Sequence, residues 1–199
     1  MTDYFALLGQ PRRPWLDAEA LKQAFFARSS EAHPDRVHGG SEAERQSANR
    51  RSSELNTAYA CLREPRDRLR HLLELELGRK PSDLQDIPES FASLFMEVAA
   101  VCREADGFIT RQAAITSPLL RAQSVTEVHE WIERLQTFQR RISELQNELL
   151  VELQGLDAEW NEARSRNLLL PKLERICRWL GFFGRWHSQV QERVNRLMR

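Results

Sequence analysis

The tripeptide His33-Pro34-Asp35 places an imidazole and a carboxylate two residues apart. Side chains of these types act either in acid–base catalysis or in charge-assisted hydrogen bonds to a partner. The sequence has no nucleophile motif, no glycine-rich phosphate loop and no second set of carboxylates that would complete a catalytic site. We therefore expect a recognition site and not an enzyme. The alternative is a plain turn, because proline ends the preceding helix.

The balance of charge argues against several classes of partner. Lys plus Arg and Asp plus Glu both total 29, so the formal net charge is zero. Because general nucleic-acid binding normally requires an excess of basic residues, we expect no nucleic-acid partner. No run approaches the roughly 20 apolar residues that span a bilayer, and the N-terminus lacks the pattern of a signal or transit peptide. We expect a cytoplasmic protein that binds no membrane.

The three cysteines, Cys61, Cys102 and Cys177, are widely separated in the sequence. Neither a CxxC pair nor a Cys/His cluster occurs, and a zinc site of ordinary spacing is therefore not expected. Reduced, partly buried thiols are the default in a cytosolic protein. The sequence predicts no metal site and no cofactor.

Two helices must hold the His-Pro-Asp tripeptide between them. Asp17 is a good N-cap for the first helix, which must end before Pro34. Ser41 begins the second helix with the capping box SEAE, and this helix breaks at Pro65. Helices of similar length joined by a short loop predict an antiparallel hairpin, with the tripeptide at its exposed tip.

Shorter apolar segments flank this hairpin. Residues 4–9 end at Gly9, and a helix over roughly 66–77 ends at Gly78, which is a plausible left-handed C-cap. We expect His71, like the other histidines in helical stretches, to lie at the surface or its boundary.

A change of pattern divides the chain. The stretch 78–88 is polar, contains two prolines and is predicted to be a linker. It separates a first domain at 1–77 from a second at 89–199. Apolar residues at spacings of 3 and 4 predict three antiparallel helices in the second domain, with Pro118 and Gly155 between them. These helices are expected at about 89–115, at about 125–153 and from about 157 towards the end.

Several stretches resemble a known family. The opening DYFALLG, the HPD between two helices and the stretch LNTAYACLREPRDRLRHLL are similar to those of J-domain co-chaperones. Farther along, MEV at 96–98 and LDAEW at 156–160 are similar to HscB, the J-protein of iron–sulfur cluster assembly. No Gly/Phe-rich stretch or CxxCxGxG zinc module follows, which argues against a general DnaJ-type protein. The predicted fold is all-α, with a J-domain followed by a three-helix bundle.

The resemblance implies that the HPD loop docks on an HscA/DnaK-type heat-shock chaperone and stimulates its ATP hydrolysis. His33, Pro34 and Asp35 would carry this role, with Lys22 and Arg36 beside them. Asp35 would accept a charge-assisted hydrogen bond from a partner arginine, and Pro34 would lower the ordering cost of binding. His33 would donate and accept hydrogen bonds that hold the tip.

The helix before the tripeptide departs from the family pattern. Family members often carry Lys or Arg where this chain has Gln23, Phe26, Ala27 and Glu31, and Arg28 stands where a core leucine is usual. Weaker electrostatic steering towards the chaperone is expected. Phe26 either adds an exposed apolar contact or is partly buried by rotation of the helix. One hypothesis is a dedicated chaperone with a matching surface.

The resemblance also implies that the bundle binds an IscU-like iron–sulfur scaffold protein through an apolar patch. The matching positions are Phe95, Met96 and Ala99 on its first helix and Phe182 on its third. Core packing is the alternative for Met96 and for part of the aromatic cluster around Phe182. The expected function is delivery of the scaffold protein to the chaperone. The alternatives are a J-protein with a different client and a helical interaction protein with a vestigial J-domain.

Overall fold

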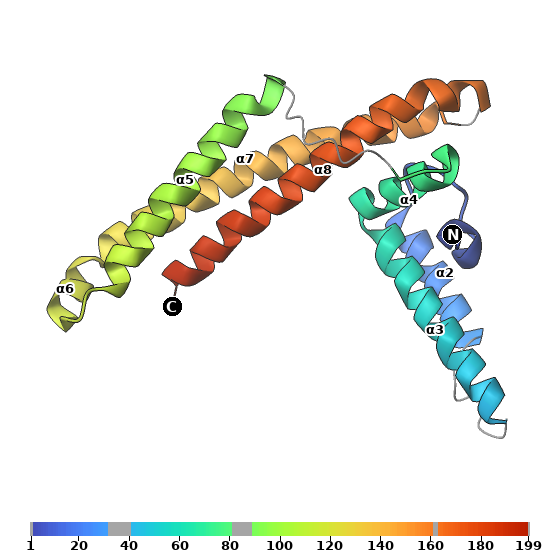
Figure 1. Ribbon diagram of the computed structural model, residues 1–199, viewed down its shortest axis with the longest axis horizontal. Helices are drawn as coiled ribbons and strands as arrows, with labels where there is room; N and C mark the ends of the chain where they lie inside the picture. The colour runs from blue at the N-terminus through green and yellow to red at the C-terminus, as the bar shows by residue number, and fades with distance from the viewer. Residues whose placement is uncertain (1, 32–40, 81–88, 161–162, 199) are drawn as a thin grey trace. The chain divides into compact units, whose positions relative to one another are not determined.

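The computed structural model describes residues 2–31, 41–80, 89–160 and 163–198, without the side chains of residues 89–91 and 163–165. All regular secondary structure in these ranges is helical, which confirms the predicted all-α class (Figure 1). The helices are α1 (Tyr4–Leu8), α2 (Ala18–Glu31), α3 (Glu42–Arg63), α4 (Pro65–Leu77), α5 (Glu89–Ala113), α6 (Pro118–Gln123), α7 (Val125–Ala158) and α8 (Ala163–Leu197).

The chain forms two compact units. The first unit consists of Met1–Ser82 and Leu150–Arg178, and the second unit consists of Asp83–Leu149 and Trp179–Arg199. Helices α7 and α8 therefore contribute one part of their length to each unit. The linker at 78–88 and the domain limits drawn around it stay a prediction, because residues 81–88 lie outside the described part.

Local capping explains where the helices of the first unit begin. The Asp17 carboxylate accepts a hydrogen bond of 2.7 Å from the backbone N–H of Ala20, ahead of α2. At α3 the backbone N–H of Glu44 donates to Ser41 Oγ (3.3 Å), and the backbone N–H of Ser41 donates to Glu44 Oε2 (2.7 Å). This is the predicted capping box.

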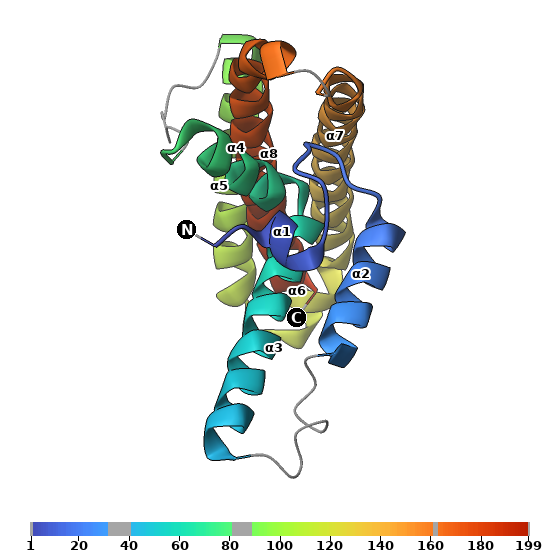
Figure 2. The ribbon, with the colours of Figure 1, turned by 90° about the vertical axis from the view of Figure 1, so that its right-hand side faces the viewer.

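Helices α2 and α3 lie side by side in the first unit and run antiparallel (Figure 2). The Phe25 ring of α2 stacks on the Tyr59 ring of α3, with the centroids 4.4 Å apart. Both Gly9 and Gly78 adopt positive φ angles, of +63° and +65°, and end α1 and α4 as C-caps. The apolar core between these helices consists of Phe5, Leu8, Leu21, Leu55, Leu62, Leu69, Leu72 and Leu73.

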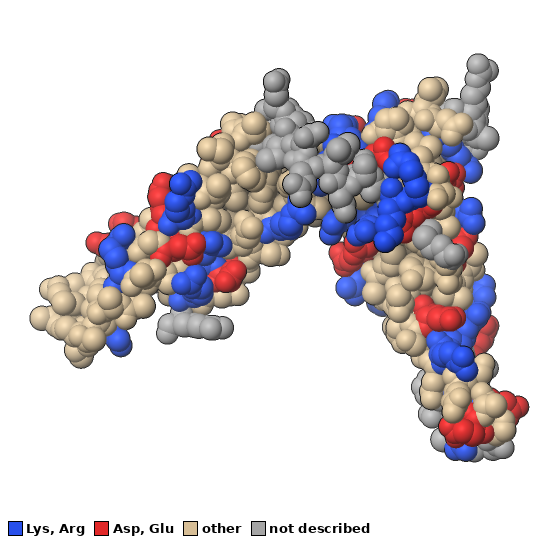
Figure 3. Space-filling view, viewed as in Figure 1, with Lys and Arg blue, Asp and Glu red and all other residues tan. Residues whose placement is uncertain are grey.

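The second unit is a bundle of α5 with the adjoining parts of α7 and α8, and α6 connects α5 to α7 (Figure 1). Each of the three predicted helices has a counterpart, α5, α7 and α8, in the predicted order. Their buried residues include Val98, Val101, Ala105, Leu135, Ile142, Phe183, Trp186, Val190 and Val194. Charged residues of both signs are interspersed on the visible face of each unit (Figure 3).

Two details of the second half differ from the prediction. Helix α7 continues through Gly155 to Ala158, so α8 begins at Ala163 and not near 157. A glycine inside a helix costs about 1 kcal/mol, and burial of Leu153 and Leu156 on either side of it offsets that cost. The short helix α6 was not predicted, and Pro118 begins it at a position where a missing N–H costs nothing.

Candidate functional site

The loop residues His33, Pro34, Asp35 and Arg36 lie outside the described residues. The structure does describe the two helices that the loop connects. Because α2 packs against α3 through Phe25 and Tyr59, the ends of the loop belong to one helical hairpin. The assignment of these four residues to chaperone binding stays a prediction.

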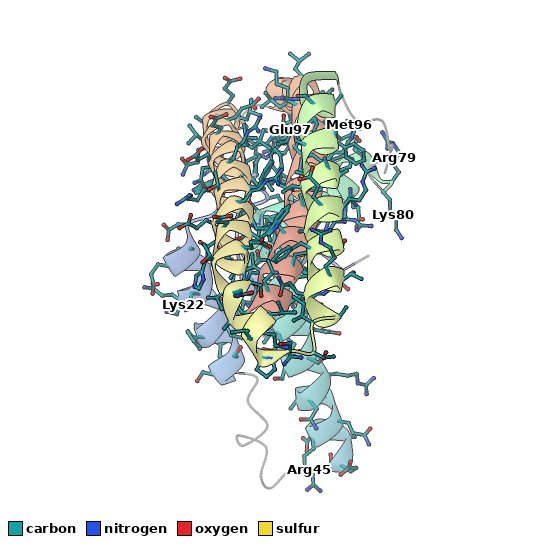
Figure 4. All side chains as sticks on the ribbon, turned by 90° about the vertical axis from the view of Figure 1, so that its left-hand side faces the viewer. Lys22, Arg45, Arg79, Lys80, Met96 and Glu97 are labelled. Atoms are coloured by element: carbon teal, nitrogen blue, oxygen red, sulfur yellow. The ribbon has the colours of Figure 1, made fainter. Side chains whose placement is uncertain are left out.

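Lys22 lies on the outer face of α2 and is exposed (Figure 4). Its Nζ atom is 3.9 Å from Glu19 Oε2, and both side chains are at least half exposed. An exposed pair at this distance contributes little to stability, so Lys22 is available to a partner. Phe26, one turn further along the same face, is 58% exposed. The alternative in which rotation of the helix partly buries Phe26 is therefore wrong.

Arg28 lies on the opposite side of α2 from this outer face. Its Nη2 atom is 2.8 Å from the position that a Cβ atom on Gly9 would occupy. Its guanidinium thus covers the end of α1 in a half-buried position, and adds little charge to the outer face. The positive φ of Gly9 favours glycine at this position, because other residues are strained there.

His71 is buried, contrary to the expectation that it lies at the surface or its boundary. Its Nε2 atom accepts a hydrogen bond of 3.0 Å from the backbone N–H of Tyr4, and the two rings stack with centroids 4.4 Å apart. Burial, the largest cause, lowers the pKa of His71 below its usual 6.5. The neutral ring is therefore the form that joins α4 to α1.

A buried carboxylate, Asp157, holds the loop between α1 and α2 against the end of α7 within the first unit. Asp157 Oδ1 accepts hydrogen bonds from Arg13 Nε (3.0 Å) and from the backbone N–H of Trp15 (2.9 Å). The indole N–H of Trp160 donates to the backbone carbonyl of Arg12 (2.9 Å). We call these five residues, Arg12, Arg13, Trp15, Asp157 and Trp160, the Asp157 anchor.

Arg68 supports the anchor from α4. Its guanidinium donates to the backbone carbonyls of Pro14 and Leu62, both at 2.9 Å, and lies under the Trp15 ring. Burial lowers the pKa of Arg68 to about 10, so the group is still charged at neutral pH. The sequence held one signal of this anchor, the LDAEW stretch, but nothing in it showed which residues Asp157 and Trp160 contact.

The residues predicted to bind a scaffold protein, Phe95, Met96, Ala99 and Phe182, are called the bundle patch. Phe95 and Phe182 both contact the buried Trp186, with ring centroids 6.3 and 5.8 Å away. Met96 is 62% exposed (Figure 4), while Ala99 is half-buried. The structure thus joins the two phenylalanines through one indole and leaves the Met96 side chain on the surface.

Charged groups border the bundle patch. Arg141 of α7 pairs with Glu97, next to Met96 on α5. The Arg185 guanidinium lies over the Phe182 ring, 4.7 Å from its centroid. An apolar centre with a charged border is the usual composition of a protein-binding surface.

The three cysteines form no disulfide with one another, and burial is the main cause that raises the pKa of Cys61 to about 11. Among the described residues, no three His, Cys, Asp or Glu side chains gather where they could hold a metal ion. In that same part of the chain, no helix is both long enough and apolar enough to cross a membrane.

The sequence is similar to curated HscB co-chaperones over part of its length. No protein-family model matches the chain. The co-chaperone HscB homologue of Chromobacterium violaceum is 40% identical over 73 residues, which are 37% of this chain and 42% of that protein. The homologue of Bordetella petrii is 44% identical over 72 residues, which are 36% of this chain and 42% of that protein. The sequence match thus spans less than half the length of these curated relatives.

The likeness in structure extends over nearly the whole chain. The chaperone HscB of Vibrio cholerae matches 96% of this chain and 96% of its own, with a TM-score of 0.64 and 26% identity. The chain resembles the HscB co-chaperones. Human HscB matches 98% of this chain and 81% of its own at a TM-score of 0.59, and at 17% identity it supports the fold alone. The Asp157 anchor and the bundle patch are thus described on an HscB-like fold.

Proposed function

We propose that this HscB-like chain is a co-chaperone that stimulates ATP hydrolysis by an HscA/DnaK-type heat-shock chaperone and delivers an IscU-like iron–sulfur scaffold protein to it. The observation that carries the proposal is the α2–α3 hairpin, whose connecting sequence contains HPD, within a fold that matches an HscB over 96% of both chains. The chain itself would catalyse no reaction and would work in the cytoplasm.

In this proposal the two candidate surfaces would bind different partners. His33, Pro34, Asp35 and Arg36, with Lys22 on α2, would engage the chaperone. The bundle patch would bind the scaffold protein, with the exposed Met96 as a first contact and with Phe95 and Phe182, both packed on Trp186, as further contacts. The cluster itself would be cargo of the scaffold protein, and no group of this chain would ligate it.

The test measures ATP turnover by the HscA- and DnaK-type chaperones of the same organism, with the full chain or its His33→Gln variant added. We expect the wild type to stimulate turnover and the variant not to. The scaffold protein added with the wild type should raise the rate further. If neither protein stimulates any of these chaperones, the co-chaperone function is contradicted and a helical interaction protein with a vestigial J-domain is favoured.

A different client is the second candidate, because the resemblance to HscB is weaker beside the bundle patch, where Ala100 stands at a position at which that family commonly has an acidic residue. A pull-down with the full chain discriminates between the two. Enrichment of a cluster scaffold protein that is lost in a Phe182→Ala variant supports the first function. Capture of some other protein at the same patch, with no scaffold protein, supports the second.

A further inference from the structure

The outer face of α2 contains one large apolar side chain. Lys22, Gln23, Phe26 and Ala27 are all exposed, and their spacings of 3 and 4 place them on one face of the helix. Within the described ranges 2–31 and 41–80, Phe26 is the one large hydrophobic residue that is exposed, at 58%. Single exposed apolar residues are common on proteins. The packing of α2 and the charges around Phe26 indicate a binding role for this residue.

Packing on the inner face fixes the orientation of α2. Leu21 is buried, and the Phe25 ring stacks on Tyr59 of α3 at 4.4 Å. Because successive residues of a helix point about 100° apart, Phe26 must then face away from α3. Its ring contacts that of Phe25 with the centroids 5.6 Å apart, which holds its base against the helix and leaves the rest in solvent.

The charges of α2 do not make this face basic. The helix contains two basic residues, Lys22 and Arg28, and two acidic ones, Glu19 and Glu31, so they cancel. Lys22 lies 3.9 Å from Glu19, and the Arg28 guanidinium is directed at the end of α1. An acidic partner surface would gain little attraction here, whereas an apolar depression would complement an exposed aromatic ring.

We propose that α2 docks on the chaperone by inserting Phe26 into an apolar depression of that partner, in place of salt-dependent attraction between charged faces. The inference rests on the proposed function and names the chemistry of its partner surface. Phe26 stands five residues before Glu31, where α2 ends, which is about 7.5 Å along the helix axis. A partner bound to the sequence that follows α2 therefore has Phe26 within reach.

The experiment measures the concentration of full-length chain that gives half-maximal stimulation of ATP turnover by the HscA- or DnaK-type chaperone, at low and at high KCl. Phe26→Ala should raise this concentration about tenfold and leave the maximal rate unchanged, because an aromatic anchor contributes to binding and not to the trigger. The wild type should change less than about threefold between the two salts. Phe26→Lys should be as weak as Phe26→Ala. Val151→Ala, which truncates another exposed apolar residue, should behave as the wild type.

Two sets of outcomes separate the inference from the function on which it rests. Loss of stimulation in Asp35→Asn together with an unchanged Phe26→Ala variant would overturn the role of Phe26 and leave the co-chaperone function intact. A Phe26→Lys variant that binds more tightly than the wild type at low salt would also overturn it, since the partner surface would then be acidic. If the wild type stimulates no chaperone, or Asp35→Asn remains fully active, the function and the inference both fail.

Discussion

The Asp157 anchor and the bundle patch use aromatic residues in opposite ways. In the anchor, the Trp15 backbone N–H donates to the Asp157 carboxylate and the Trp160 indole N–H donates to a backbone carbonyl, so polar contacts of 2.9–3.0 Å set the geometry. In the bundle patch, Phe95 and Phe182 pack on Trp186, and ring contacts set the geometry. The anchor is therefore sensitive to the loss of a single charge, whereas the patch is sensitive to the loss of volume.

The two sites also differ in whether a substitution changes stability alone or stability and binding together. Asp157 is buried, so its replacement tests the fold of the first unit. Phe95 and Phe182 are half-buried, and truncating either one changes the core and the surface together. Met96 is the residue of the patch that separates binding from stability, because its side chain is mostly in solvent.

The largest expected effect is in the second unit. Trp186→Ala removes a side chain that is 4% exposed and is shared by both phenylalanines of the bundle patch. We expect the free energy of unfolding to fall by about 3–5 kcal/mol, because a large cavity remains. Urea denaturation followed by circular dichroism measures this. A loss below about 1 kcal/mol would show that Trp186 does not hold the patch together.

In the first unit, Asp157→Ala removes the acceptor of both the Arg13 guanidinium and the Trp15 backbone N–H. We expect a loss of about 2 kcal/mol, since a buried donor is left unsatisfied and Arg13 is partly exposed to water. Thermal denaturation gives the value. Glu159→Ala, at an exposed position two residues away, is the control and should stay within about 0.5 kcal/mol of the wild type.

Lowering the pH should reduce the free energy of unfolding of the first unit through protonation of His71. Its pKa is lowered in the folded protein, so the unfolded chain binds more protons in the interval below 6.5. The stability that the neutral ring provides is complete above this pH and is lost as the pH falls towards the folded pKa. Nearby Asp3 and Glu74 oppose the shift and Arg12 adds to it. The measurement is the free energy of unfolding at about pH 7.5 and about pH 5.5.

A matched pair of variants assigns this pH dependence. His71→Gln keeps a polar side chain and should flatten the change in stability over that interval. His129→Gln replaces an exposed histidine and should leave the change as it is in the wild type. Equal pH dependence in all three proteins would contradict the role of His71.

The smallest expected effect on stability is that of Met96→Ala, at a side chain 62% exposed. The free energy of unfolding should change by less than about 0.5 kcal/mol. Binding of the iron–sulfur scaffold protein, measured by calorimetry, should weaken about tenfold if Met96 is an anchor of the interface. Met198→Ala truncates a methionine of similar exposure elsewhere and should leave the affinity unchanged. Equal affinities of the two variants would remove Met96 from the patch.

Much of the fold of the first unit follows from local signals in the sequence. Asp17, the Ser41–Glu44 capping box, Gly9 and Gly78 each mark a helix end where the structure has one. Such signals are reliable because the capping group and the backbone that it satisfies lie within a few residues of each other. Gly155 is also a local signal, but it does not end α7. Glycine often ends a helix, yet it is tolerated inside one where the neighbouring residues are buried.

The candidate site was predictable in composition but less so in its contacts. The bundle patch residues were named from a resemblance, and the structure adds that Trp186 joins two of them. The exposure of Phe26 depended on which way α2 faces α3, and the pairing of Phe25 with Tyr59 decided it. The spacing of four between Leu21 and Phe25 favours one shared face for these two residues, but it does not show that this face packs on α3.

The sequence alone determined the all-α class, the hairpin around His33-Pro34-Asp35 and the ends of most helices, because those features depend on residues close together along the chain. Only the tertiary structure decided the burial of His71 and Asp157. Their partners are Tyr4, 67 positions from His71, and Arg13, 144 positions from Asp157. A polar side chain is buried only where distant segments satisfy its hydrogen bonds, and the pattern of a single helix does not contain that information.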